Sequence, residues 1–160
     1  MDAPDALGPE RVVTGDVLIA MRSSGLHSNG YSLARRVLMP DASALEEVVP
    51  ELTRSVGEEL LEPTRIYARD CLALIESADV HAFSHITGGG IAANVARVLP
   101  DDQAADLDRS TWTPHAIFSL LASRGGIDPR EMERTFNMGL GMVAVVGQAS
   151  VEQALATLTE

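Results

Sequence analysis

The chain has 160 residues, enough for one domain with a hydrophobic core, and its formal net charge of −11 argues against nucleic acid or an anionic membrane as a partner. All 12 basic residues are arginine, which excludes from this chain a phosphate loop that needs lysine and Schiff-base chemistry. The only cysteine, Cys71, excludes an internal disulfide. No signal or membrane-spanning pattern appears, so we expect a cytoplasmic protein.

The first half of the chain predicts one strand and two helices. Residues 1–14 contain proline and glycine and are expected to form a loop or short edge segment. The apolar run at residues 17–21 is typical of a buried strand, and residues 31–38 predict a helix. Residues 41–61 are expected to be helical in part, with a break at a proline. A firmer helix is predicted over residues 63–77.

The second half predicts more strands and helices in alternation. Strands are expected at residues 81–87, 104–111 and 141–146, the second of them half-exposed because apolar and acidic residues alternate. Helices are expected over residues 91–99, over residues 117–123 after the capping signal at residues 113–114, and after the capping signals at residues 128–131 and 150–153. The alternation indicates a single α/β domain with helices packed on a sheet.

Two glycine-rich loops are the most informative feature, and each lies between an expected strand and an expected helix. The first, SSGLHSNG at residues 23–30, offers short polar side chains and a histidine, His27, that we expect to be exposed. The second is HITGGG at residues 85–90. Backbone N–H groups at such positions favour an anion such as phosphate, which suggests a site for a phosphorylated small molecule. The alternatives are an ordinary strand-to-helix turn in the first loop and close packing in the second.

Other candidate residues point to structure more than to chemistry. His81 and His85 lie four residues apart on one expected strand and so point to the same face, but no third metal ligand is evident, so no metal site is expected. His115 is expected to be exposed in the first turn of a helix. Asn137 is expected to cap a helix C-terminus, and Cys71 to lie on an apolar helix face.

Four blocks between residues 13 and 146 together resemble one family. In order, they are GDVLIAMRSSGLHSNGYSLARRVL, LLEPTRIYARDCLALIE, VHAFSHITGGGIAANVARVLP and RTFNMGLGMVAVV. They resemble the C-terminal half of phosphoribosylformylglycinamidine cyclo-ligase, also called aminoimidazole ribonucleotide synthetase. The resemblance implies the α/β fold of that superfamily's C-terminal domain, a mixed sheet with helices packed on it, over residues 1–160.

The resemblance also implies an activity. This family uses ATP to activate the formyl oxygen of formylglycinamidine ribonucleotide, after which an amidine nitrogen closes the imidazole ring in purine biosynthesis. Mg²⁺ and ATP are expected to bind mainly to an N-terminal half that this sequence lacks. That domain, the nucleotide substrate and a second copy in a homodimer are the expected partners, and the isolated chain is expected to be inactive.

By likeness to the family, His27 faces the reacting substrate, where its imidazole stabilises charge or moves a proton. The other residues expected to line the cleft are Ser24, Gly25, Ser28 and Asn29 in the first loop and Thr87, Gly88, Gly89 and Gly90 in the second. The alternatives are a related domain of formylglycinamidine ribonucleotide synthetase, of a hydrogenase-maturation protein or of selenophosphate synthetase, and a non-catalytic docking or ligand-binding domain. The blocks SSGLHSNGYSL and PTRIY favour the cyclo-ligase.

Overall fold

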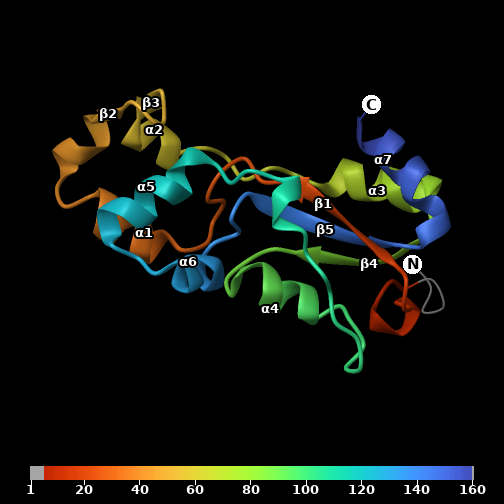
Figure 1. Ribbon diagram of the computed structural model, residues 1–160. Helices are drawn as coiled ribbons and strands as arrows, with labels where there is room; N and C mark the ends of the chain where they lie inside the picture. The colour runs from red at the N-terminus through yellow and green to blue at the C-terminus, as the bar shows by residue number, and fades with distance from the viewer. Residues whose placement is uncertain (1–5, 160) are drawn as a thin grey trace.

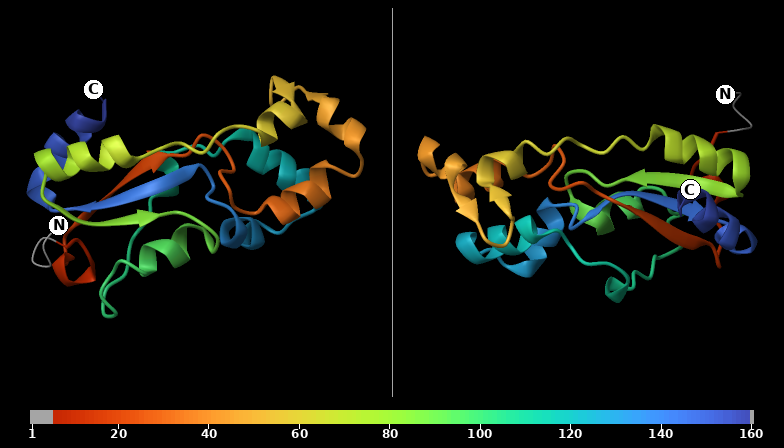
Figure 2. Two further views of the ribbon diagram at one scale, coloured as in Figure 1. Left: turned by 180° about the vertical axis from the view of Figure 1, so that it is seen from behind. Right: turned by 90° about the horizontal axis from the view of Figure 1, so that it is seen from above.

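The computed structural model describes residues 6–159, which form an elongated molecule of two adjoining lobes (Figures 1 and 2). The strands are β1 (Val17–Arg22), β2 (Val48–Val49), β3 (Arg54–Ser55), β4 (Val80–His85) and β5 (Leu140–Val146). The helices are α1 (Tyr31–Leu38), α2 (Val56–Leu60), α3 (Ala68–Ser77), α4 (Gly90–Ala96), α5 (Ala116–Gly125), α6 (Pro129–Thr135) and α7 (Val151–Thr159). Short 3-10 turns are η2 (Pro9–Arg11), η3 (Ala42–Glu46), η4 (Arg109–Thr111) and η5 (Gln148–Ser150). Among these described residues, no helix is long and apolar enough to cross a membrane.

One lobe is built on a three-stranded sheet with the order β1-β5-β4. Both pairings are antiparallel, and β5 lies at the centre because its run LGMVAVV is apolar on both faces. Helices α3 and α7 cover one face and α4 covers part of the other (Figure 1). The α/β class predicted from the sequence is confirmed.

The face under α3 and α7 holds one apolar core, in which Leu74 and Ala154 are fully buried. The predicted apolar face of α3 is confirmed, because Tyr67, Cys71 and Ala78 also contact this core. On α7, however, Leu155 is 49% exposed and does not join it.

The second lobe packs α1, α2, α5 and α6 around a separate core, beside the small β2–β3 hairpin (Figures 1 and 2). Its largest fully buried side chains include Phe118, Phe136 and Leu121. The chain passes from this lobe to the sheet lobe through residues 62–67, which belong to no helix or strand. The predicted helix over residues 63–77 therefore begins late, at Ala68.

Two other sequence expectations were wrong in detail, and a third holds in part. Residues 104–108 form no strand, because they pair with no neighbour and their acidic residues are exposed. Residues 41–61 are helical in part, as expected, in η3 and α2, but the break between them is the β2–β3 hairpin; Ser55 caps α2 and forms a capping box with Glu58. The N-cap of α5 is His115 and not Thr113. The expected loop at residues 1–14 lies partly outside the described residues.

Candidate functional site

The two glycine-rich loops meet at the junction of the lobes. The first connects β1 to α1 and the second connects β4 to α4, as predicted. They are joined directly, because the Gly88 N–H donates to Oδ1 of Asn29 at 3.0 Å. Two segments that are 59 residues apart in the sequence thus form one surface.

His27 lies under this surface and not on it. Its side chain is only 4% exposed, which corrects the expectation of an exposed residue. Its backbone is left-handed, with φ 57°, so the loop turns inward at this residue. Nε2 accepts from the N–H groups of Ser24 at 3.1 Å and Arg65 at 3.5 Å.

The two backbone donors fix the tautomer of His27. Because a backbone N–H can only donate, Nε2 carries no proton and the proton of the neutral ring is on Nδ1. This Nδ1 is buried and has no hydrogen-bond partner among the described residues. Burial lowers the pKa of His27 below the ordinary 6.5, and His85 and His115 nearby lower it further. The ring is therefore neutral at physiological pH, with one unused donor.

Tyr67 and Gly141 hold the imidazole in place from the sheet side. The Tyr67 ring centroid lies 6.1 Å from that of His27, and its hydroxyl donates to the Arg22 carbonyl at 2.8 Å. Burial raises the pKa of Tyr67 to about 12, so it remains a donor. Gly141 has no partner residue in β1, because Met21 pairs with Met142 and Arg22 pairs with Leu140. Gly141 therefore forms a bulge in β5. A Cβ at Gly141 would overlap the Tyr67 hydroxyl and lie 2.7 Å from Cε1 of His27.

Asn137 fixes the backbone of the first loop. Fully buried, it donates through Nδ2 to the carbonyls of Gly25 at 2.9 Å and Leu26 at 3.1 Å. Its Oδ1 accepts from the Ser23 hydroxyl and the Gly139 N–H. The expectation of a C-cap was wrong, because α6 ends at Thr135 with Phe136 as its cap.

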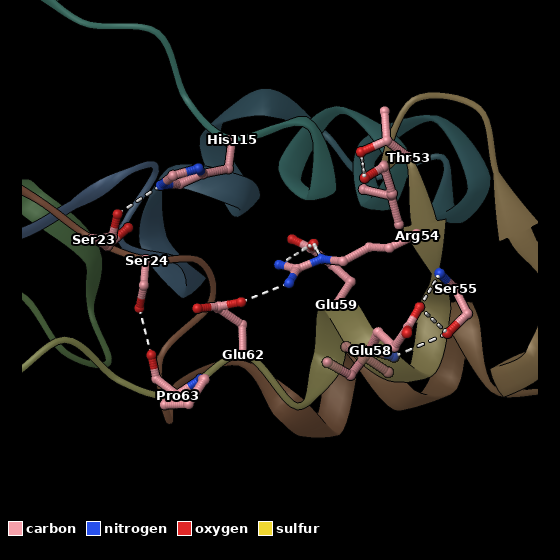
Figure 3. A network of polar contacts seen from close by, with 12 residues as sticks. Ser23, Ser24, Thr53, Arg54, Ser55, Glu58, Glu59, Glu62, Pro63 and His115 are labelled. Atoms are coloured by element: carbon pink, nitrogen blue, oxygen red, sulfur yellow. Dashed lines mark hydrogen bonds and ion pairs between the residues drawn. The ribbon is translucent and has the colours of Figure 1, made fainter.

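The segment 62–67, between α2 and α3, lies against the first loop. Ser24 Oγ donates to the Pro63 carbonyl at 2.6 Å, and the hydroxyls of Ser28 and Thr64 are 3.4 Å apart. Figure 3 shows the Ser24–Pro63 contact beside Glu62, which pairs with Arg54 at 2.6 Å. Gly25, buried next to Ser24, has the Glu62 side chain within 3.9 Å of a Cβ placed on it.

In the second loop, part of the hydrogen-bonding capacity serves the fold. The Thr87 hydroxyl donates to Oδ1 of Asn94, and the Asn94 amide donates to the Gly90 carbonyl at 2.7 Å. Gly90 is buried where a Cβ would overlap the carbonyl of Glu133 on α6. Close packing therefore accounts for Gly90, whereas Gly88 and Gly89 are exposed. The close-packing alternative raised for this loop applies at that one glycine.

Two of the other histidines, His115 and His81, have structural partners. His115 is half-buried, and its Nε2 lies 2.7 Å from the Ser23 carbonyl (Figure 3), which corrects the expectation of an exposed residue. His81 bonds the carboxylates of Asp16 and Asp79. Within residues 6–159, no group of three or more His, Cys, Asp or Glu side chains is placed to hold a metal ion.

Sequence reasoning missed Arg65 as a member of the site and used Tyr67 only as a core residue. Both lie in PTRIY, and the Arg65 guanidinium stacks 5.4 Å from the Tyr67 ring centroid while it pairs with Asp70. The proline at residue 63 disfavours helix only in the residue before it, so the sequence held no clear signal for the irregular residues that follow it.

Comparison with known proteins shows which family this chain matches. The model of the AIR synthase related protein C-terminal domain matches residues 13–160. A putative phosphoribosylformylglycinamidine cyclo-ligase of Streptomyces fradiae is 58% identical over 147 residues, which cover 91% of this chain and 81% of the relative. The cyclo-ligases of Anaeromyxobacter sp. (strain Fw109-5) and Myxococcus xanthus are 53% and 50% identical over 92% of this chain. The chain spans only 43% of the length of each of these two.

Proposed function

The chain belongs to the family of the AIR synthase related protein C-terminal domain, and on this basis we propose that it forms the substrate-cleft half of a phosphoribosylformylglycinamidine cyclo-ligase. The reaction is ATP-dependent closure of the imidazole ring of formylglycinamidine ribonucleotide. The observation that carries the proposal is the joined pair of glycine loops above a buried, neutral histidine with one free donor.

His27 acts in this proposal as a hydrogen-bond donor and not as a base. Its Nε2 is occupied by the Ser24 and Arg65 N–H groups, so it is not available to take a proton. A buried N–H without an acceptor costs about 1–3 kcal/mol. A substrate oxygen that accepts a hydrogen bond from Nδ1–H removes this cost. The hydrogen bond is strongest when negative charge develops on that oxygen in the transition state.

The loop residues position the nucleotide. Ser28 and the exposed Gly88 and Gly89 present hydroxyl and backbone groups at the surface above His27. Asn29 holds the two loops at a fixed separation through its bond to Gly88. Ser24, Gly25, Thr87 and Gly90 shape the loops from below, because their polar groups or their packing are engaged inside the chain.

ATP and Mg²⁺ are not assigned to this chain. The sequence has no lysine, and the described residues hold no group of carboxylates and histidines suited to a metal. In the proposal the nucleoside triphosphate supplies the phosphoryl group for formyl-oxygen activation from a site outside these residues. No step of the chemistry above depends on it.

A chimeric enzyme tests the proposal. Residues 13–160 of this chain replace the matching part of the Myxococcus xanthus relative, and ATP-dependent formation of aminoimidazole ribonucleotide is measured. We expect turnover, and we expect His27→Gln to lower kcat on the order of 10²-fold, as for the loss of one charge-stabilising donor. His81→Gln is the matched control, since that histidine lies away from the loops.

Two results would contradict the proposal. A chimera that folds, as judged by its circular dichroism and a cooperative thermal transition, yet forms no product would exclude the cleft assignment. Equal loss of activity in His27→Gln and His81→Gln, in proportion to lost folded protein, would show that His27 only supports the fold.

A further inference from the structure

Strand β1 has an uncovered edge. In the order β1-β5-β4 both β1 and β4 are outer strands. The outer edge of β4 is contacted by the segment that leads into η2, where the Gly8 N–H donates to the His81 carbonyl at 3.0 Å. Within residues 6–159, no backbone–backbone hydrogen bond joins residues 17–21 to any segment but β5, and the Tyr67 hydroxyl reaches only the last residue of the strand, at the Arg22 carbonyl.

The composition of β1 does not protect this edge. Its sequence, VLIAMR, contains no proline, and its only charge is at its last residue, Arg22. The bulge in the β1–β5 pairing falls at that same end, which leaves residues 17–21 regular. Native sheets blunt free edges with charges, prolines or bulges, or they cover them with another segment. Residues 17–21 of β1 contain no charged residue, no proline and no bulge.

A groove of about 650 Å³ lies beside this edge. Its floor is apolar and includes Leu18 and Ala20 of β1 and Val143 and Val145 of β5. Its wall is formed by the segment 99–112. Within this segment, residues 104–108 have no regular structure, although their apolar and acidic residues alternate as in a strand. The groove is on the face opposite the core of Tyr67 and Leu74, so it is separate from the His27 site.

The rim of the groove is acidic. Asp16, Asp102, Asp106 and Asp108 are among the lining residues, and no arginine is. Asp16 already bonds His81, and Asp108 accepts from the Ser110 N–H. Asp102 and Asp106 are exposed, and neither forms an ion pair with another described residue. An occupant that places basic side chains against this rim is therefore favoured over an acidic one.

We propose that this groove receives an extended segment of a partner polypeptide, which adds a strand to the edge of β1 and turns apolar and basic side chains into the groove. Backbone hydrogen bonds to β1 supply affinity, and alternate side chains supply selectivity. The edge of six residues is about 20 Å long, which suits a strand of ordinary length. A second copy of this chain is disfavoured as the occupant, because its net charge is −11.

The test uses the full 160-residue chain and a defined probe. The probe is an end-capped nine-residue peptide with the sequence Thr-Val-Thr-Arg-Thr-Val-Thr-Arg-Thr. A second peptide carries glutamate in place of arginine. Backbone amide NMR spectra are followed during titration with each. We expect the arginine peptide to shift the resonances of Leu18, Ala20 and Asp106 first, and the glutamate peptide to leave them unchanged.

Two variants locate the site. Ala20→Arg, at an exposed position of the groove floor, is expected to weaken arginine-peptide binding about tenfold through bulk and like charge. Leu155→Arg is the matched control, because Leu155 is exposed on α7 over the other sheet face, and it should bind as the unmodified chain does. Asp106→Asn should weaken binding by a smaller factor.

Three outcomes overturn the proposal. They are equal binding of the two peptides, unchanged affinity in Ala20→Arg, and concentration-dependent dimerisation of the chain that Ala20→Arg abolishes. The last would assign the edge to a second copy. Failure of the proposed cyclo-ligase activity would leave these results unaffected, because the groove and the His27 site are on opposite faces.

Discussion

At the scale of single residues, the adjacent glycines of HITGGG have different reasons to be glycine. Gly89 and Gly90 have φ values of 103° and 72°, a region in which other residues are strained. At Gly90 a Cβ would also overlap the Glu133 carbonyl, which belongs to backbone and cannot move aside cheaply. At Gly89 the nearest atom is Cβ of Ala93, at 3.3 Å.

Alanine substitutions should separate these cases. We expect Gly90→Ala to lower the free energy of unfolding by about 3 kcal/mol or more, because α4 must move away from α6. We expect Gly89→Ala to lower it by about 1 kcal/mol through backbone strain, and in the chimera to raise KM, as the site assignment requires. Urea denaturation measures the free energy of unfolding of both variants. Equal losses for the two variants would contradict the packing argument.

For His27, the sequence predicted some properties of the residue and not others. Its place in a loop of serines and glycines indicated a site, and the family likeness indicated substrate contact. Its burial was not predictable, because it depends on Arg65 and Tyr67, which lie 38 and 40 residues further along the chain. The choice between donor and base also depends on those contacts.

At the scale of elements, His81 joins the ends of two strands that are not paired with each other. Its Nδ1 lies 2.6 Å from the Asp16 carboxylate, just before β1, and its Nε2 lies 3.2 Å from that of Asp79, just before β4. Burial lowers the pKa of His81, but the hydrogen bonds and charges of Asp16 and Asp79 outweigh it, so the pKa is raised above 6.5. The folded chain thus binds this proton more tightly than the unfolded chain.

The stability of the chain should therefore depend on pH through this cluster. The contribution of His81 is complete below its ordinary pKa of 6.5 and is lost as pH rises through the raised pKa of the folded state. We expect His81→Asn to reduce the urea midpoint more at about pH 6 than at about pH 9. Asp79→Asn should weaken the same dependence. A cost of His81→Asn that is equal at both pH values would contradict this account.

Elements also show where local pattern is sufficient. The strands expected at residues 17–21 and 81–87 are confirmed as β1 and β4, and each is followed by a glycine-rich loop. The alternation at residues 104–111 predicted a strand wrongly. A strand exists only where a neighbour accepts its hydrogen bonds, and no described segment pairs with these residues.

At the scale of the whole molecule, the proposed reaction needs ATP and Mg²⁺, and the described residues include no group of side chains suited to hold the metal ion. We expect the purified chain alone to form no aminoimidazole ribonucleotide and to hydrolyse no ATP, because it has no lysine and no metal-holding group among its described residues. Product formation and phosphate release are measured beside the chimera as a positive control. Turnover by the chain alone that scales with its concentration would refute this expectation.

The sequence by itself determined the α/β class, the positions of β1, β4 and β5, and the two loops between strand and helix. These depend on periodicity and on glycine, which act over a few residues. Only the tertiary structure decided that the loops touch through Asn29 and Gly88, that His27 is buried and neutral, and that β1 keeps a free edge beside an acidic groove. Each of these depends on contacts between segments far apart in the chain, whose approach is set by how the two cores pack and not by local preference.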